Sequence, residues 1–163
     1  MKNNSYSKGQ LNALVLLRLF IGWHFLYEGL IKFFNPSWTA KGYLMGAGGP
    51  LKGFFQWLAG DGMIGAIDFL NITALILVGL ALTLGFWTKW FSYVGIGLLL
   101  LYYFAYPPLP GWEVTGPAEG SYFIINKNLI EAAALAILIQ FPAAQHFGLE
   151  VFFKKKLKDN PTT

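Results

Sequence analysis

Four ionisable residues lie at helical spacing in one apolar stretch near the start of the chain. Arg18, His24, Glu28 and Lys32 fall within R-L-F-I-G-W-H-F-L-Y-E-G-L-I-K. At about 100° per residue, these side chains share roughly a third of the surface of one helix. Charged groups at bilayer depth cost several kcal/mol unless they are paired or hydrated. We therefore expect this stripe to face other helices rather than lipid.

Two further apolar stretches carry polar residues at a matching depth. Asp68 and Asn71 are three residues apart and share a helix face, and Glu131 follows soon after a polar connection. Counted from the ends of their stretches, Glu28, Asp68 and Glu131 fall in one layer. His24 is one turn deeper than Glu28. The rim of this polar layer is predicted to contain Lys32, Asn126 and Lys127.

The polar layer brings together residue types that carry protons. Buried carboxyl and imidazole groups can exchange protons with a bound ligand, so we predict a catalytic role for His24, Glu28, Asp68 and Glu131. We assign substrate binding to Arg18, Lys32, Asn71, Asn126 and Lys127. A structural alternative stays open for several positions: Arg18 as an ion pair or anchor near the inner surface, Lys32 as a snorkelling cation, and Gly22 with Gly29 as a helix-packing groove.

Metal and haem chemistry have weaker support in the sequence. His24, Glu28, Asp68 and Glu131 are possible ligands for zinc or manganese. A b-type haem needs two facing axial ligands, and the other histidine, His146, is expected near the opposite end of its helix. The chain has no cysteine, which excludes disulfides, thiolate sites and dithiol redox chemistry. We expect neither haem nor metal.

The composition is that of an integral membrane protein. Of 163 residues, 55% are hydrophobic and only 12% are charged, whereas soluble domains have about a quarter charged residues. The net charge of +4 does not indicate nucleic-acid binding, because four of the twelve cations cluster in the tail, at Lys154, Lys155, Lys156 and Lys158. A basic cluster directly after an apolar segment is typical of a cytoplasmic anchor.

The apolar stretches predict an all-α fold: a four-helix transmembrane bundle in a single domain spanning residues 1–163. The membrane-spanning helices are predicted at about 11–34, 63–86, 90–106 and 126–147. The cleanest apolar part of the fourth, 129–141, is too short alone and must extend upstream through 122–125 or downstream past Pro142. Between the first two helices, residues 51–58 predict a short interfacial helix.

Lysine distribution predicts the orientation of the bundle. Four spans place both termini on one side, together with Lys2, Lys8, Lys89 and the tail lysines, against four lysines on the other side. The positive-inside rule then places both termini in the cytoplasm, with the protein in the inner (cytoplasmic) membrane.

Several motifs resemble the DoxX family of small membrane proteins. R-x-x-x-G at Arg18 and G-x-x-K ending at Lys32 are similar to its first-helix pattern. N-P-x-W from Asn35 and the run E-G-S-Y-F-I-I-N-K-N-L-I-E ending at Glu131 are closer to the DoxD-like branch. The resemblance covers about residues 17–145. It implies four spans with cytoplasmic termini, and DoxD is named as a subunit of a thiosulfate:quinone oxidoreductase.

Two functional hypotheses follow. The first is a quinone-linked oxidoreductase, or its membrane subunit, that binds quinone in the polar layer and works with a second redox subunit. The second is a non-enzymatic carrier of a small molecule or lipid, or an assembly factor for a membrane complex. A buried polar layer is compatible with both. Membrane lipids are partners in either case.

Overall fold

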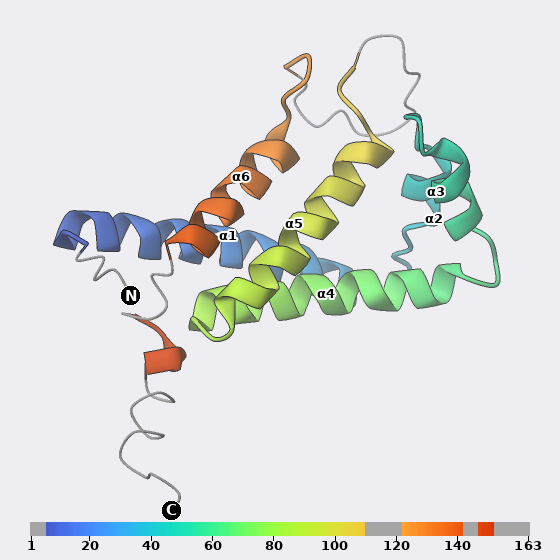
Figure 1. Ribbon diagram of the computed structural model, residues 1–163. Coiled ribbons are helices and arrows are strands. Elements are labelled where there is room, and N and C mark those ends of the chain that lie inside the picture. The colour runs from blue at the N-terminus through green and yellow to red at the C-terminus, as the bar shows by residue number, and fades with distance from the viewer. Residues whose placement is uncertain (1–5, 110–121, 142–146, 152–163) are drawn as a thin grey trace, which may run out of the picture.

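The computed structural model describes residues 6–109, 122–141 and 147–151. Lys2, Glu119, His146 and the tail lysines lie outside these residues. Figure 1 shows the helices, whose bounds are α1 Lys8–Phe33, α2 Lys41–Met45, α3 Lys52–Leu58, α4 Ile64–Leu84, α5 Thr88–Ala105 and α6 Lys127–Gln140. The described part of the chain is all-α, and its one β feature is an isolated bridge between Tyr122 and Ile125.

Helix α1 begins three residues earlier than the prediction for this segment because a capping box precedes it. The backbone N–H of Gln10 donates to Ser7 Oγ at 3.2 Å, and the Ser7 N–H donates to Gln10 Oε1 at 2.9 Å. This reciprocal pair satisfies two backbone donors that a helix start leaves free. The helix continues as one element through the whole charged stripe to Phe33.

The fourth long helix is shorter than predicted. Helix α6 has 14 residues, and Asn126 caps its start by accepting a hydrogen bond from the Leu129 N–H at 3.1 Å. The predicted upstream extension through 122–125 is wrong, because those residues form a tight turn instead. The downstream alternative, at 142–146, lies outside the described residues. Helix α2 was not predicted, since its five residues carry too few apolar positions to show a period.

Helices α1 and α4 run antiparallel and nearly touch along three glycines. A Cβ at Gly79 would lie 2.4 Å from the backbone nitrogen of Leu26, and one at Gly22 would lie 2.8 Å from that of Thr83. A Cβ at Gly29 would lie 3.0 Å from the backbone nitrogen of Ile76. The packing role considered for Gly22 and Gly29 is therefore confirmed. Small residues at a helix interface allow this approach and bring many atoms into van der Waals contact.

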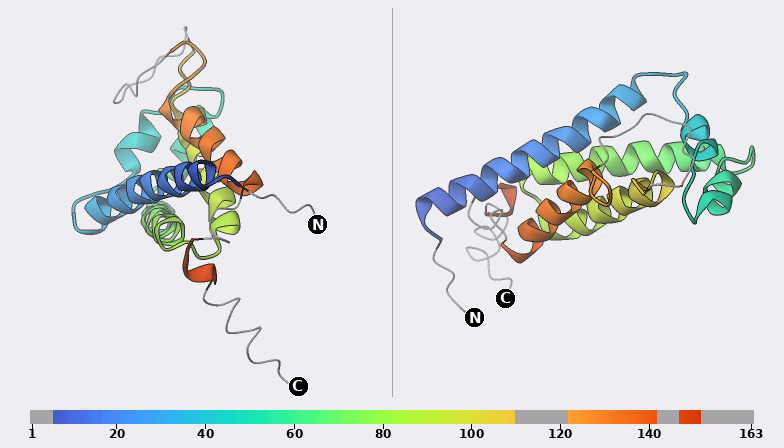
Figure 2. Two further views of the ribbon diagram at one scale, coloured as in Figure 1. Left: turned by 90° about the vertical axis from the view of Figure 1, so that its left-hand side faces the viewer. Right: turned by 90° about the horizontal axis from the view of Figure 1, so that it is seen from above.

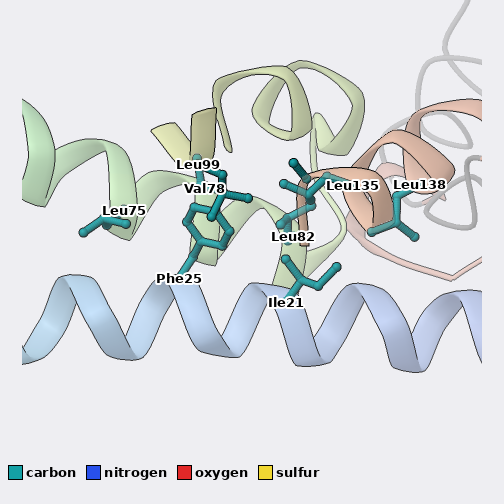
Figure 3. Close-up of a cluster of buried hydrophobic side chains, with 9 residues drawn as sticks. Ile21, Phe25, Leu75, Val78, Leu82, Leu99, Leu135 and Leu138 are labelled. Atoms are coloured by element: carbon teal, nitrogen blue, oxygen red, sulfur yellow. The ribbon is translucent and has the colours of Figure 1, made fainter. Parts of the chain in front are cut away.

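One apolar core joins the four long helices (Figure 3). Phe25 from α1 is 2% exposed, and Val78, Leu82 and Leu135 are fully buried. Around them pack Ile21, Leu75, Leu99, Ala132 and Leu138. Helix α1 lies along α4 and α5 lies along α6, with the second pair inclined to the first (Figure 1). Helices α2 and α3 lie at the opposite end of the molecule from the N-terminus (Figure 2). A second core, which includes Leu44, Phe55 and Ala105, packs α2 and α3 against the end of α5.

The outer surface of the helices is strongly apolar. Phe20, Trp23, Phe69 and Trp90 each expose more than half of their side chains. By length and composition, α1 and α4 could each cross a membrane. Large exposed apolar surfaces of this kind need a partner that is not water, such as lipid.

Replacing Gly79 with Ala should destabilise the helix pair, because the new methyl group would collide with the Leu26 backbone. We expect a loss of about 1–3 kcal/mol, as for other overpacked sites, measured by unfolding in detergent micelles. Gly97→Ala on α5 is the matched control, since no atom lies within 4 Å of its added Cβ. Equal stability of the two variants would contradict this account of the α1–α4 contact.

Candidate functional site

A hydrogen bond between His24 and Glu131 joins the middle of α1 to the first turns of α6. The His24 Nδ1 lies 2.8 Å from Glu131 Oε1. An ionised carboxylate can only accept, so the Nδ1–H is the donor and Nε2 stays available for another group. The buried neighbours Phe25 and Leu135 hold the two side chains in place, since each is packed in the core one residue or one turn away. The His24 side chain is 42% exposed and that of Glu131 is 14% exposed.

A second ion pair lies one turn further along α1. Lys32 Nζ donates to the Glu28 carboxylate and, at 3.1 Å, to the Glu28 backbone oxygen. The same ammonium group lies 5.7 Å from the centroid of the Trp38 ring, which is within cation–π range. Lys32 is thus directed back along α1 rather than outward into solvent.

The start of α6 places further polar side chains close to His24 and Glu28. Lys127 is the first residue of α6 and lies one turn before Glu131 on the same face. The charges of both Lys127 and Glu28 act on the His24 imidazole. Asn126 is 1% exposed and is used as the helix cap. We call His24, Glu28, Lys32, Lys127 and Glu131 the α1–α6 polar cluster.

Asp68 and Asn71 make their contacts elsewhere. Asp68 Oδ1 accepts a hydrogen bond from the Ala40 N–H at 2.8 Å, and Asn71 Nδ2 donates to the Tyr102 hydroxyl at 2.6 Å. These bonds tie α4 to the segment before α2 and to α5. The single layer expected from helix depth is therefore divided between two neighbourhoods, because depth does not determine which neighbouring helix a side chain meets.

Arg18 lies far down α1 from the cluster and is 4% exposed. Its Nη1 donates to the Phe147 backbone oxygen at 2.7 Å. The guanidinium packs against Gly85, whose φ is +70° and whose Cβ would lie 2.4 Å from Nη1. The Glu150 N–H also donates to the Gly85 oxygen, at 3.1 Å. Arg18 and Gly85 together thus fix residues 147–151 to the end of α4.

The acidic and histidine side chains of the described residues are dispersed, and an apolar groove lies elsewhere. In this part of the chain, no three His, Asp or Glu side chains gather as a metal-binding group. An apolar groove of about 200 Å³ lies between the end of α1 and α4, lined by Phe33, Phe69, Ile72, Thr73, Ile76 and Leu77. None of these lining residues belongs to the α1–α6 polar cluster.

Lys41, at the start of α2, and Asp61, after α3, form an exposed ion pair. Lys41 Nζ donates to Asp61 Oδ1 at 2.6 Å, and this hydrogen bond holds the pKa of Asp61 below its ordinary value. A lowered pKa stabilises the fold above the unfolded-state pKa, and that contribution disappears as pH falls through the folded-state value. The Asp61 carboxylate is fully exposed, so solvent screening keeps the contribution small.

The residues that sequence reasoning missed are mainly aromatic. The Tyr102 hydroxyl accepts the hydrogen bond from Asn71 Nδ2, and the Tyr103 hydroxyl donates to the Ile124 backbone oxygen at 2.9 Å. The Y-Y-F-A-Y end of α5 was a visible signal, but its tyrosines could not be assigned partners from spacing alone. On α1, Phe20 and Tyr27 lie exposed beside His24 and give the cluster an apolar border.

Two helices long and apolar enough to cross a membrane, together with a mostly apolar outer surface, indicate an α-helical membrane protein. The DoxX family model matches residues 13–107, which is more than half of the chain. The protein therefore belongs to the DoxX family. The matched region includes α1 from its second turn through α5, but not Glu131. No curated protein and no solved structure matches the chain.

Replacing Asp68 with Ala should leave the Ala40 N–H without its partner. We expect a loss of about 1–3 kcal/mol in unfolding free energy, the usual cost of an unsatisfied buried donor. Asp61→Ala serves as the control and should leave unfolding in detergent unchanged, because its carboxylate is exposed. An Asp68→Ala protein as stable as this control would show that the bond to Ala40 does not hold the segment.

Proposed function

We propose that α1, α4, α5 and α6 form a four-helix transmembrane bundle, with α3 as an interfacial helix. Helix α1 packs along α4 and α5 packs along α6, the second pair is inclined to the first (Figure 1), and the apolar outer faces of the four helices support a position in the membrane. Phe54 and Trp57 on α3 are exposed and suit the headgroup region. The lysine distribution supports cytoplasmic termini and a position in the inner membrane.

We further propose that the protein is the quinone-binding membrane subunit of an oxidoreductase. The observation that carries this proposal is the His24–Glu131 pair, which is half-exposed on the His24 side and bordered by exposed apolar side chains. A quinone needs an apolar slot for its ring and a proton donor near its carbonyl oxygens. The imidazole would supply the proton donor, and the exposed side chains of Phe20 and Tyr27 would supply apolar surface beside it.

The chemistry assigned to the pair is proton transfer. His24 Nε2 would donate a proton to a quinone carbonyl, and the Glu131 carboxylate on Nδ1 would stabilise the imidazolium. Reduction to the quinol requires two electrons and two protons. The electrons would come from a second redox subunit or from a donor bound to it, and the second proton would pass through His24 after its imidazole is reprotonated from water. Lys32 and Lys127 would attract an anionic donor.

The DoxD-like motifs support placing the chain in that branch, with thiosulfate as the donor of the complex. The motifs are N-P-x-W at Asn35 and N-K-N-L-I-E ending at Glu131. Each motif contains one residue that contacts α1 in the structure. Trp38 lies near Lys32, and Glu131 bonds to His24. The redox roles associated with the DoxX family agree with this proposal.

A non-enzymatic carrier or assembly factor is the second candidate. It is favoured by the pairing of each acid in the predicted layer within the chain: Glu28 with Lys32, Glu131 with His24, and Asp68 with the Ala40 N–H. Such pairing is what a helix scaffold requires. Under this reading, replacing an acid would lower stability without changing any ligand affinity.

The two candidates are separated by quinone titration of the protein in lipid nanodiscs, read by quenching of its six tryptophans. Glu131→Gln should weaken quinone binding about tenfold, equivalent to about 1.4 kcal/mol, because the His24 imidazolium loses its charged partner. Asp61→Asn should bind as the parent does. A Glu131→Gln protein with a lower melting temperature and unchanged quinone affinity would favour the scaffold.

A further inference from the structure

Residues 122–125, which precede the α6 cap Asn126, form a tight turn with unusual backbone geometry. The Tyr122 N–H donates to the Ile125 oxygen at 2.9 Å, and the Ile125 N–H donates back to the Tyr122 oxygen at 3.3 Å. Phe123 has a φ of 67°, in the left-handed region where turns usually place Gly or Asn. A bulky residue persists in such a conformation only when its surroundings favour it, which makes the outlier a pointer to function.

Every side chain of this turn is large, apolar and exposed. Tyr122 is 74% exposed, Phe123 64%, Ile124 50% and Ile125 48%. The turn projects from the start of α6, above the ends of α5 and α6 in Figure 1. Four consecutive exposed side chains of this kind would be costly in water.

The backbone of the turn is nevertheless largely satisfied from within the protein. The N–H groups of Tyr122, Ile124 and Ile125 all donate to backbone oxygens of the turn. The Ile124 oxygen accepts from the Tyr103 hydroxyl at 2.9 Å. Unpaired backbone polar groups are costly in hydrocarbon, so this internal pairing lowers the cost of placing the turn against lipid.

Helix α6 is shorter than the hydrocarbon core of a bilayer, so the turn before it can also lie within that core. Its 14 residues extend about 21 Å, whereas the hydrocarbon core of a bilayer is about 30 Å thick. The turn continues the exposed apolar surface of the neighbouring helices, which includes Phe104 on α5 and Ile130 on α6. Its apolar side chains therefore extend the lipid-facing surface beyond the first residue of α6.

We propose that residues 122–125 are a membrane-inserted turn whose side chains contact the acyl chains of the leaflet at that end of the bundle. The turn leads directly into Asn126, which caps α6 and is 1% exposed. Anchoring the turn in lipid holds the start of α6, and with it Lys127 and Glu131, at a fixed depth. This inference depends on the protein spanning the membrane and is independent of quinone binding.

The absence of native cysteine allows a direct test. A nitroxide is attached to Phe123→Cys in the full chain, reconstituted in phosphatidylcholine–phosphatidylglycerol vesicles. Power-saturation electron paramagnetic resonance then compares collisions with oxygen, which concentrates in hydrocarbon, and with a water-soluble nickel chelate. Ile124→Cys provides a second label in case the first disturbs the turn.

Two labelled controls bracket the result. Phe69→Cys reports the lipid-facing surface of α4, where Phe69 is 68% exposed, and Asp61→Cys reports an exposed connection. We expect both turn labels to favour oxygen as the Phe69 label does, reversing the preference of the Asp61 label. A nickel preference at the turn, or low collision with both reagents because protein covers it, would overturn the proposal.

Discussion

The close crossing of α1 and α4 determines how the rest of the protein is arranged. Gly79 meets the Leu26 backbone so closely that neither helix can rotate without a collision. With Gly22 and Gly29 held against α4, Arg18 on the same face of α1 lies against Gly85 at the end of α4, whereas His24 is turned away from α4. That orientation directs His24 to α6 and Arg18 to residues 147–151.

The polar groups of the protein then serve different purposes according to where that orientation places them. Arg18, Asp68 and Asn71 bind backbone or tyrosine groups and hold connecting segments in place. His24 and Glu131 instead link α1 to α6 at a point where the imidazole is still half-exposed. The half-exposed imidazole can be reached from outside the helices, so the His24–Glu131 pair is the better candidate for chemistry.

Helical periodicity was sufficient to predict the long helices, the charged stripe and the glycine groove. The tight turn at 122–125 was not predictable, because Phe123 adopts a backbone conformation that its residue type disfavours. The partners of Asp68 and Asn71 depend on tertiary packing against α2 and α5, which spacing within one helix cannot reveal. His24 and Glu131 were both predicted, but their bond follows from the rotation fixed by Gly79.

A quinone headgroup is proposed to bind beside His24 and Glu131, between α1 and α6, and its position can be mapped. The most direct test is photolabelling of the protein in native-lipid nanodiscs with an azidoquinone, followed by mapping of the labelled peptides. The account predicts labels on α1 around Phe20 to Ile31 and on α6, suppressed by excess unlabelled quinone. Labels in the apolar groove at Phe33 and Phe69, or labels that excess quinone does not suppress, would contradict it.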